Sequence, residues 1–166
     1  MAEFKNIPDS DHVLRWARPK KHLQWDPEIQ QFVGCDHSLF KCRTDAEFVE
    51  RYGGPEKSLS VNYVEHFKGA EQERLKQTVL DYSNGSGASR NTLRKSYFSK
   101  LNVGGLKNIC HKHGAKIRVI HDATPNSRIK SHGSINQLSQ DNHFLFEDLC
   151  KFAFQNLIAA ERFLQR

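Results

Sequence analysis

Hydrophobic side chains recur with two different periods in this chain, and each period occupies its own part of the sequence. In residues 11–19 (DHVLRWARP) and 59–63 (LSVNY) apolar and polar positions alternate, and a period of two predicts β-strands. From residue 69 onward apolar positions mostly recur three and four residues apart, which predicts helices. Because the strands come early, we expect an α+β fold with one mixed β-sheet. Helices from the middle and C-terminal parts would pack on it in a single domain over residues 1–166.

Turn and cap residues set the bounds of these elements. Thr44 and Glu47 have the spacing of a capping box, Gly53 and Gly114 suit left-handed helix ends, and Asp141 can cap the closing helix. We therefore expect strands at 11–19, on either side of Asp26-Pro27, at 59–63 and at 115–121. The expected helices are 44–53, 69–82, 91–101, 106–113 and 142–164. Loops are expected at 83–89, which is a flexible Gly/Ser segment, and at 122–140.

The composition is that of a folded chain in an aqueous compartment. Hydrophobic residues make up 37% and charged residues 27% of the 166 residues, which suffices for one core without covalent staples. No run of eighteen apolar residues could span a bilayer, and the polar first twelve residues lack the apolar stretch of a secretion signal. We therefore expect a cytoplasmic protein that does not associate with a membrane.

The four cysteines, Cys35, Cys42, Cys110 and Cys150, admit two interpretations. A zinc site would join Cys35, His37 and Cys42 to Cys110, but structural zinc sites usually present tight C-x-x-C pairs, which these spacings lack. Reduced, buried thiols suit a cytoplasmic chain better. We therefore predict no metal and no cofactor, and keep zinc as an alternative.

Between Asp81 and Asp122 the chain has no acidic residue. This interval holds eight Lys/Arg against a net charge of +6 for the whole chain, so the remainder, with 17 basic and 19 acidic residues, is slightly acidic. A one-sided positive field attracts a nucleic acid, another polyanion or an acidic protein surface; a solvated basic face without a partner is the alternative. The predicted nucleic-acid-binding residues are Arg90, Arg94, Lys95, Lys100, Lys107, Lys112, Lys116 and Arg118.

Histidines gather around the end of the strand expected at 115–121. His121-Asp122 ends that strand and His132 follows across the loop. Since imidazoles titrate near neutral pH, two of them can share the acid and base roles of phosphodiester chemistry. A tandem-histidine phosphoesterase would need two H-x-[ST] motifs, of which only His132 with Ser134 is present. Two-metal catalysis needs several carboxylates as metal ligands, and this segment offers only Asp122. The alternative for His121 is a polar strand end bonded to the backbone.

A second polar group comes from distant segments, with His12 and Arg15 on the first strand and Ser60, Asn62 and Glu65 on a later one. Arg15 has the chemistry to clamp a phosphate. The alternative is a structural ion pair between Arg15 and Glu65. The candidate catalytic residues from both groups are His12, Arg15, Glu65, His121, Asp122 and His132.

Four motifs carry a resemblance: DHVLRWARP (11–19), LSVNYVEHF (59–67), LNVGGL (101–106) and RVIHD (118–122), with His132 some ten residues later. The set resembles an uncharacterised group of small bacterial hypothetical proteins that share D-H-V-x-R, L-S-V-N-[WY]-x-E and V-I-H-D followed by a histidine. The resemblance covers most of the chain and brings no activity with it. It implies a bacterial source, and it implies that one constellation contains His12, Arg15, Ser60, Asn62, Glu65, His121, Asp122 and His132. Tyr63 stands where the group usually has tryptophan.

The sequence leaves two functions open, and with them the question whether the protein is an enzyme. The first is a small cytosolic accessory protein that binds a nucleic acid or a protein partner from the same operon through the basic interval. Such proteins occur in defence or toxin–antitoxin gene pairs. The second is an enzyme acting on a nucleotide or nucleic-acid substrate, with Arg15 on the phosphate and a histidine moving the proton.

Overall fold

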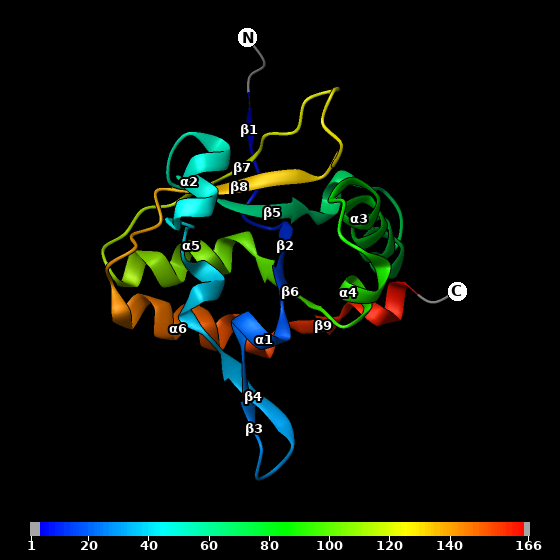
Figure 1. Ribbon diagram of the computed structural model, residues 1–166. Coiled ribbons are helices and arrows are strands. Elements are labelled where there is room, and N and C mark those ends of the chain that lie inside the picture. Colours follow the sequence, from blue (N-terminus) through cyan, green and yellow to red (C-terminus); the bar gives the residue numbers. More distant parts are fainter. Residues whose placement is uncertain (1–3, 165–166) are drawn as a thin grey trace.

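An antiparallel sheet of seven strands forms the centre of the molecule in a computed structural model, which describes residues 4–164 (Figure 1). Its strand order is β1-β7-β8-β5-β2-β6-β9. The strands are β1 (Lys5–Asn6), β2 (His12–Ala17), β5 (Leu59–Tyr63), β6 (Tyr97–Asn102), β7 (Arg118–His121), β8 (His132–Asn136) and β9 (Leu157–Ala159). The predicted α+β class is confirmed, but every strand pair described is antiparallel, so the sheet is not mixed.

Helices cover both faces of this sheet, because alternate residues of each strand point to opposite sides. Val13 packs in a core with α5 and α6, whereas the next residue, Leu14, packs in a second core with α3, α4 and η3. The helices are α3 (Glu71–Gly85), α4 (Arg90–Arg94), α5 (Val103–Lys112), α6 (His143–Gln155) and the 3-10 helix η3 (Ala160–Phe163). The strand β2 therefore holds two hydrophobic cores together.

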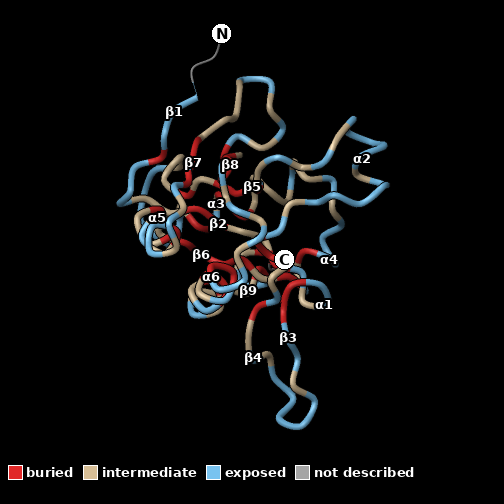
Figure 2. Tube along the Cα trace, turned by 90° about the vertical axis from the view of Figure 1, so that its left-hand side faces the viewer, coloured by how far each residue is buried: buried red, intermediate tan, exposed pale blue. Residues whose placement is uncertain are grey.

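The segment between β2 and β5 leaves the sheet and returns to it. It contains α1 (Pro19–His22), the hairpin β3 (Leu23–Asp26) and β4 (Gln31–Cys35), the 3-10 helix η1 (His37–Phe40) and α2 (Ala46–Tyr52); a further 3-10 helix, η2 (Val64–His66), follows β5. The tip of the β3–β4 hairpin projects from the body and is largely exposed (Figure 2). The predicted segments around Asp26-Pro27 are thus the two strands of this hairpin.

Several helix bounds follow from side-chain caps. Asp45, not Thr44, caps α2 by accepting a bond from the Phe48 N–H, and Asn142, not Asp141, caps α6 through the Leu145 N–H. Gly53 and Gly114 adopt the left-handed conformation expected of them (φ 79° and 72°). In α5 the Asn102 side chain accepts from the Gly105 N–H, so this helix begins at Val103, earlier than expected.

Two predicted helices are partly wrong, because apolar residues at helical spacing belong to different cores. In the segment 91–101, Leu93 lies in α4 and packs on one face of the sheet, whereas Leu101 lies in β6 and packs on the other. The predicted helix 142–164 ends at Gln155, after which β9 pairs with β6. Strand pairing overrides the local spacing in both places.

The segment 122–140, predicted as a loop, contains β8. Its glycine and polar residues suggest a turn, yet β8 pairs with β5 on one side and with β7 on the other. A Cβ atom on Gly133 would lie 2.7 Å from the Ile120 carbonyl oxygen, so this position needs glycine for close strand packing. Within residues 4–164, no helix is both long and apolar enough to cross a bilayer.

Candidate functional site

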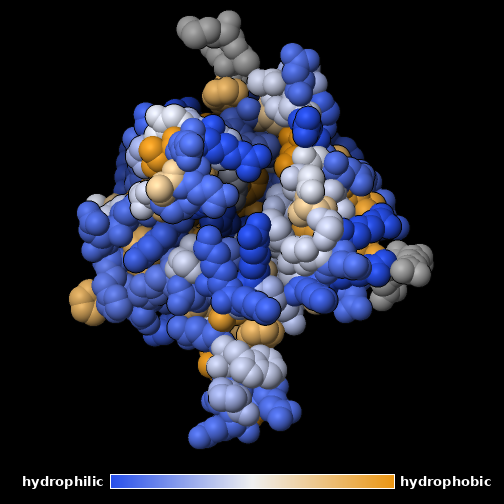
Figure 3. Space-filling view, in the orientation of Figure 1, coloured by the Kyte–Doolittle hydropathy of each residue, from blue (hydrophilic) through white to orange (hydrophobic). Residues whose placement is uncertain are grey.

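A cavity of about 750 Å³ opens where β2 and β5 separate. The two strands pair only at Val13–Tyr63 and Leu14–Asn62, and beyond these residues they diverge. Side chains from α1, η1, α2, β5 and α3 line the space between them. Figure 3 shows hydrophilic residues around the hollow in the middle of this face.

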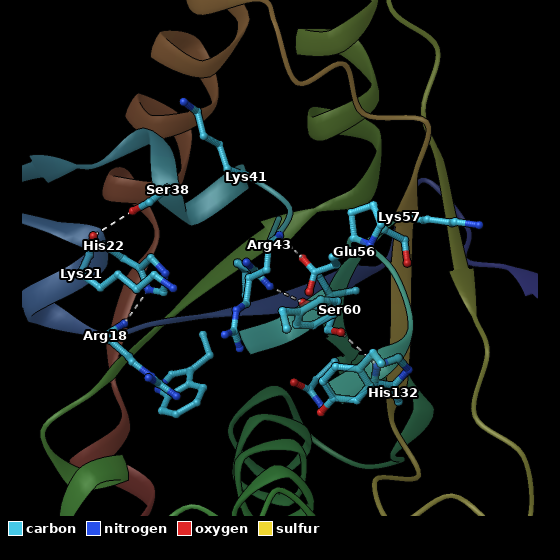
Figure 4. A pocket seen from close by; sticks show the side chains of 18 of the residues that line it. Arg18, Lys21, His22, Ser38, Lys41, Arg43, Glu56, Lys57, Ser60 and His132 are labelled. Atoms are coloured by element: carbon cyan, nitrogen blue, oxygen red, sulfur yellow. Dashed lines mark hydrogen bonds between the residues drawn. The ribbon is translucent and has the colours of Figure 1, made fainter. Parts of the chain in front are cut away.

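The wall of this cavity is strongly basic. Among the described residues that line it, the only acidic one is Glu56, whereas the Lys/Arg residues are Arg15, Arg18, Lys21, Lys41, Arg43 and Lys57. Figure 4 shows Arg18, Lys21 and His22 on one side of the cavity and Ser60 with His132 on the other. We call these six cations and the cavity they line the basic pocket. An excess of positive charge in a concave site focuses the field and attracts anions.

Arg15 bridges the gap between the diverging strands. Its Nε donates to the Leu39 carbonyl of η1 at 2.8 Å, and its Nη1 donates to the Ser60 carbonyl of β5 at 2.9 Å. Burial lowers the pKa of Arg15 while Glu56 opposes this effect, and a guanidinium stays charged in either case. With two of five N–H donors on backbone oxygens, the guanidinium is fixed in place and keeps donors for an anionic ligand.

His22 lies behind the cations as a neutral group. It is buried, and its Nδ1 accepts a bond from the Arg18 N–H at 2.9 Å. Burial, and to a smaller extent the neighbouring Arg15, Lys21 and Arg18, together lower the pKa of His22 to about 4, against a smaller opposing effect of Asp36. His22 therefore adds no charge to the basic pocket at neutral pH.

A serine, a histidine and an aspartate form a hydrogen-bonded chain at the edge of the basic pocket. His132 Nδ1 lies 2.5 Å from Asp122 Oδ1, and His132 Nε2 lies 3.3 Å from Ser60 Oγ. When Nδ1–H donates to the carboxylate, Nε2 is the acceptor for the serine hydroxyl. A hydroxyl, an imidazole and a carboxylate thus occur in the order that nucleophilic catalysis requires.

The register of three neighbouring strands produces this chain. Ser60 pairs with Ser134, Asn62 pairs with His132, and the Asp122 N–H bonds to the His132 carbonyl. Because paired residues share a face, these polar side chains come from one face of the sheet. The Asp122 carboxylate also accepts from the Ser134 hydroxyl. Burial raises the pKa of Asp122, but the bonds from His132 and Ser134 outweigh this effect and leave its pKa below the usual value.

The loop before β8 is held by Asp81 of α3. Its carboxylate accepts from the Lys130 N–H at 3.1 Å, the Ser131 N–H at 2.8 Å and the Ser131 hydroxyl at 2.6 Å. The Ser131 oxygen in turn accepts from the Asn62 side chain at 3.2 Å. These bonds fix the position at which β8 begins, and therefore the position of His132.

The remaining predicted catalytic residues lie elsewhere. His12 and Glu65 pair with each other, through the His12 Nδ1 at 2.7 Å and its N–H at 2.8 Å, so the alternative ion pair between Arg15 and Glu65 is wrong. His121 contacts the rings of Tyr63 and His66, and its Nε2 lies 2.9 Å from the Lys130 carbonyl. Of the six candidates, Arg15 and His132 line the basic pocket and Asp122 touches it through His132.

The residues of the basic interval do not converge on the basic pocket. Lys100 pairs with Glu71, Lys107 Nζ lies 2.7 Å from Asp9, and Arg118 donates to the Asn6 side chain. Arg94 donates to the Leu164 carbonyl. Four more are exposed: Arg90 on α4, Lys95 directly after α4, Lys112 on α5 and Lys116 after α5. The eight residues thus spread over four elements and two connecting segments, and two of them pair with carboxylates.

The proposed zinc ligands are not brought together. Among the described residues, the group of histidine, cysteine or acidic side chains whose ligand atoms lie within 4.8 Å of one another consists of His37, His143 and Glu147. Burial raises the pKa of the Cys35 and Cys110 thiols to about 11, which keeps them protonated. All four cysteines are free.

Sequence reasoning missed five cations of the basic pocket, namely Arg18, Lys21, Lys41, Arg43 and Lys57. They are spread over forty residues among acidic neighbours such as Asp36 and Asp45, so no local charge run reveals them. The sequence did contain one signal for the hydrogen-bonded chain of Ser60, His132 and Asp122. Ser60 and Asn62 are polar and two positions apart, as are His132 and Ser134, and this spacing puts side chains on one face of a strand.

Comparison of the chain with protein-family models, with curated proteins and with solved structures gave no match.

Proposed function

We propose that this protein is an enzyme that acts on a phosphate-containing substrate, most simply a nucleotide bound in the basic pocket. The observation that carries the proposal is the contact of His132 with both Asp122 (2.5 Å) and Ser60 (3.3 Å) at the edge of a cavity lined by six Lys/Arg. The Lys/Arg side chains bind phosphate oxygens, and Ser60, His132 and Asp122 provide the reacting groups.

The phosphate is expected on Arg15, since this guanidinium is already fixed by two backbone carbonyls next to Ser60. A planar guanidinium binds two phosphate oxygens at once and stabilises the negative charge that develops on them. Because its position is set before the ligand arrives, little ordering is needed when the phosphate binds.

The reacting groups act in sequence. His132 Nε2 takes the hydroxyl proton of Ser60 while Ser60 Oγ forms a bond to phosphorus, and the bond from phosphorus to the leaving oxygen breaks. His132 then gives its proton to the leaving oxygen, and Asp122 stabilises the imidazolium in between. In the second step His132 takes a proton from a water whose oxygen forms a bond to phosphorus. The bond from phosphorus to Ser60 Oγ breaks, and His132 returns the proton to Ser60.

The same cavity offers aromatic surface for a base. Trp16, Phe48, Tyr52 and Tyr82 line it, and the guanidinium of Arg18 lies 4.8 Å over the Trp16 ring. Bases stack on aromatic side chains and on guanidinium planes with little sequence preference. This favours a nucleotide or a single-stranded nucleic-acid end over inorganic phosphate as the substrate.

The test is turnover of a panel of nucleoside mono-, di- and triphosphates, dinucleotides and short oligonucleotides, followed by ³¹P NMR. We expect product from at least one class, with the rate falling about 10³-fold in His132→Ala. His121→Ala is the matched control, because His121 lies next to Asp122 in sequence but does not line the basic pocket. Equal rates for the two variants, or no turnover by the parent, would reject the proposal.

Binding is tested separately with two charge-matched triple variants. Lys21, Lys41 and Lys57 line the basic pocket, whereas Lys95, Lys112 and Lys116 belong to the basic interval, and all six are exposed. Replacement of the pocket set by alanine is expected to weaken pyrophosphate binding and reduce its salt dependence, while the other set has little effect. The reverse result would instead favour the accessory protein that binds a nucleic acid or a protein partner through the basic interval. That function, with its bacterial and cytoplasmic setting, remains a prediction.

A further inference from the structure

A second polar cluster lies where η1 meets the start of α6. His143 and Glu147 stand one turn apart on α6, and His37 approaches them from η1. His37 Nε2 lies 2.7 Å from Glu147 Oε1, and His143 Nε2 lies 3.7 Å from the same oxygen. None of the three side chains lines the basic pocket. We call these residues the η1–α6 cluster.

We propose that the η1–α6 cluster binds a divalent transition-metal ion of the zinc class, with water completing the coordination. Two imidazoles and one carboxylate form a ligand set that Zn²⁺ accepts. With ligand distances of 2.0–2.1 Å, the atoms around a tetrahedral ion lie about 3.3 Å apart. The observed separations of 2.7 and 3.7 Å lie on either side of that value, so small side-chain rotations would complete the site.

The ligands are held on well-packed elements. Leu145, Phe146 and Leu149 anchor α6 in the core with at most 1% exposure, which fixes the backbone of His143 and Glu147. The His37 ring stacks on the Phe146 ring at 5.7 Å and 27°, and Asp36 caps η1 by accepting from the Ser38 N–H. A site on fixed elements needs little rearrangement to receive an ion.

Nearby positive charge and the chemistry of the three ligands together limit which cation the η1–α6 cluster can bind. His143 lies in the first turn of α6, whose positive end disfavours a cation, and Lys41 lies 6.0 Å from the Phe146 ring. A hard ion such as Mg²⁺ or Ca²⁺ would need several oxygen ligands here, and the cluster supplies one carboxylate. Nitrogen ligation therefore favours a transition metal.

Metal binding would affect the basic pocket indirectly, through the position of η1. An ion would tie η1 to α6, and η1 carries the Leu39 carbonyl that accepts from Arg15 Nε at 2.8 Å. The role that follows is structural: the ion would fix the wall that positions Arg15. This inference stands on its own residues and does not depend on the reaction proposed for Ser60 and His132.

The experiment is calorimetric titration of the metal-stripped chain with Zn²⁺, together with the visible spectrum of bound Co²⁺. We expect one equivalent to bind, with an affinity at least a hundredfold lower in His143→Ala and in Glu147→Gln. Both side chains are about half exposed or more (69% and 50%), so these variants should keep the fold. Zn²⁺ should also raise the melting temperature of the parent and not that of His143→Ala.

His113→Ala is the matched control. His113 also pairs with an acidic residue of α6, with Nε2 2.7 Å from Asp148 Oδ2, but described neighbours offer no third ligand there. Its affinity for Zn²⁺ should stay within twofold of the parent. If the parent binds no Zn²⁺, or if His143→Ala binds as tightly as the parent, the inference is wrong. Loss of binding in His113→Ala alone would equally overturn it.

Discussion

Acidification should destabilise this protein well above the pH at which carboxylates protonate, because of His22. The histidine has an ordinary pKa of 6.5 and a pKa of about 4 in the fold, lowered by burial and then by Arg15, Lys21 and Arg18. Between these two values the unfolded chain binds a proton that the folded chain does not, so stability falls as the pH falls. From pH 7 to pH 5 this amounts to about 2 kcal/mol, on the basis of 1.36 kcal/mol per pKa unit.

The assay is urea unfolding at pH 7 and pH 5, for the parent and for His22→Gln. Glutamine cannot protonate, and its side-chain oxygen can still accept a bond such as the one from the Arg18 N–H. The parent should lose about 2 kcal/mol more than the variant between the two pH values. His66, whose pKa is also lowered, contributes equally to both proteins and cancels.

The same unfolding experiment can be repeated with an anion added to occupy the basic pocket. Pyrophosphate next to Arg15, Lys21 and Arg18 would offset their effect on the pKa of His22 and so reduce the pH dependence. Equal pH dependence for the parent and His22→Gln without ligand would refute this explanation of the buried histidine.

Three further variants test the packing that supports the site, each by urea unfolding at pH 7. Phe98→Ala removes a ring that is 1% exposed and should cost 3–5 kcal/mol, approximately. A loss below about 1 kcal/mol would mean that the second core is not packed as described. Gly133→Ala brings a Cβ to 2.7 Å from the Ile120 carbonyl and should cost about 3 kcal/mol; a neutral effect would contradict the β7–β8 register. Asp81→Ala leaves the N–H groups of Lys130 and Ser131 without their carboxylate and should cost about 2 kcal/mol. It should also speed hydrogen exchange at Ser131, and unchanged exchange there would count against the anchoring of β8.

The strands that the sequence predicts well are those whose own alternation is strong. The segments around Val13 and Val61 alternate in sequence and form β2 and β5. The strand β8 could not be predicted, because Gly133 and its polar neighbours look like a turn until β5 and β7 lie on both sides. The strand β9 was hidden for a related reason: Leu157 continues the apolar spacing of α6, although the chain crosses to the other face of the sheet.

The candidate site was only partly accessible from the sequence. The proximity of His132 to Asp122 was expected, because the two residues lie only ten positions apart on either side of one loop. The contact of Ser60 with His132 was not, because it depends on the register between β5 and β8, which no local sequence pattern fixes. The basic pocket depends on long-range folding, since residues from Arg15 to Lys57 meet only after the hairpin and η1 fold back. The acid-free interval, by contrast, is a local pattern whose charges the fold distributes over several elements.

The proposed reaction requires that His132 and Asp122 activate Ser60 at the edge of the basic pocket. Its most direct test needs no knowledge of the substrate: treat the protein with a fluorophosphonate and locate the adduct by mass spectrometry. We expect one adduct per chain, on Ser60, that is lost in His132→Ala, greatly slowed in Asp122→Asn and retained in His121→Ala. An unmodified Ser60 in the parent, or an adduct that persists in His132→Ala, would contradict it.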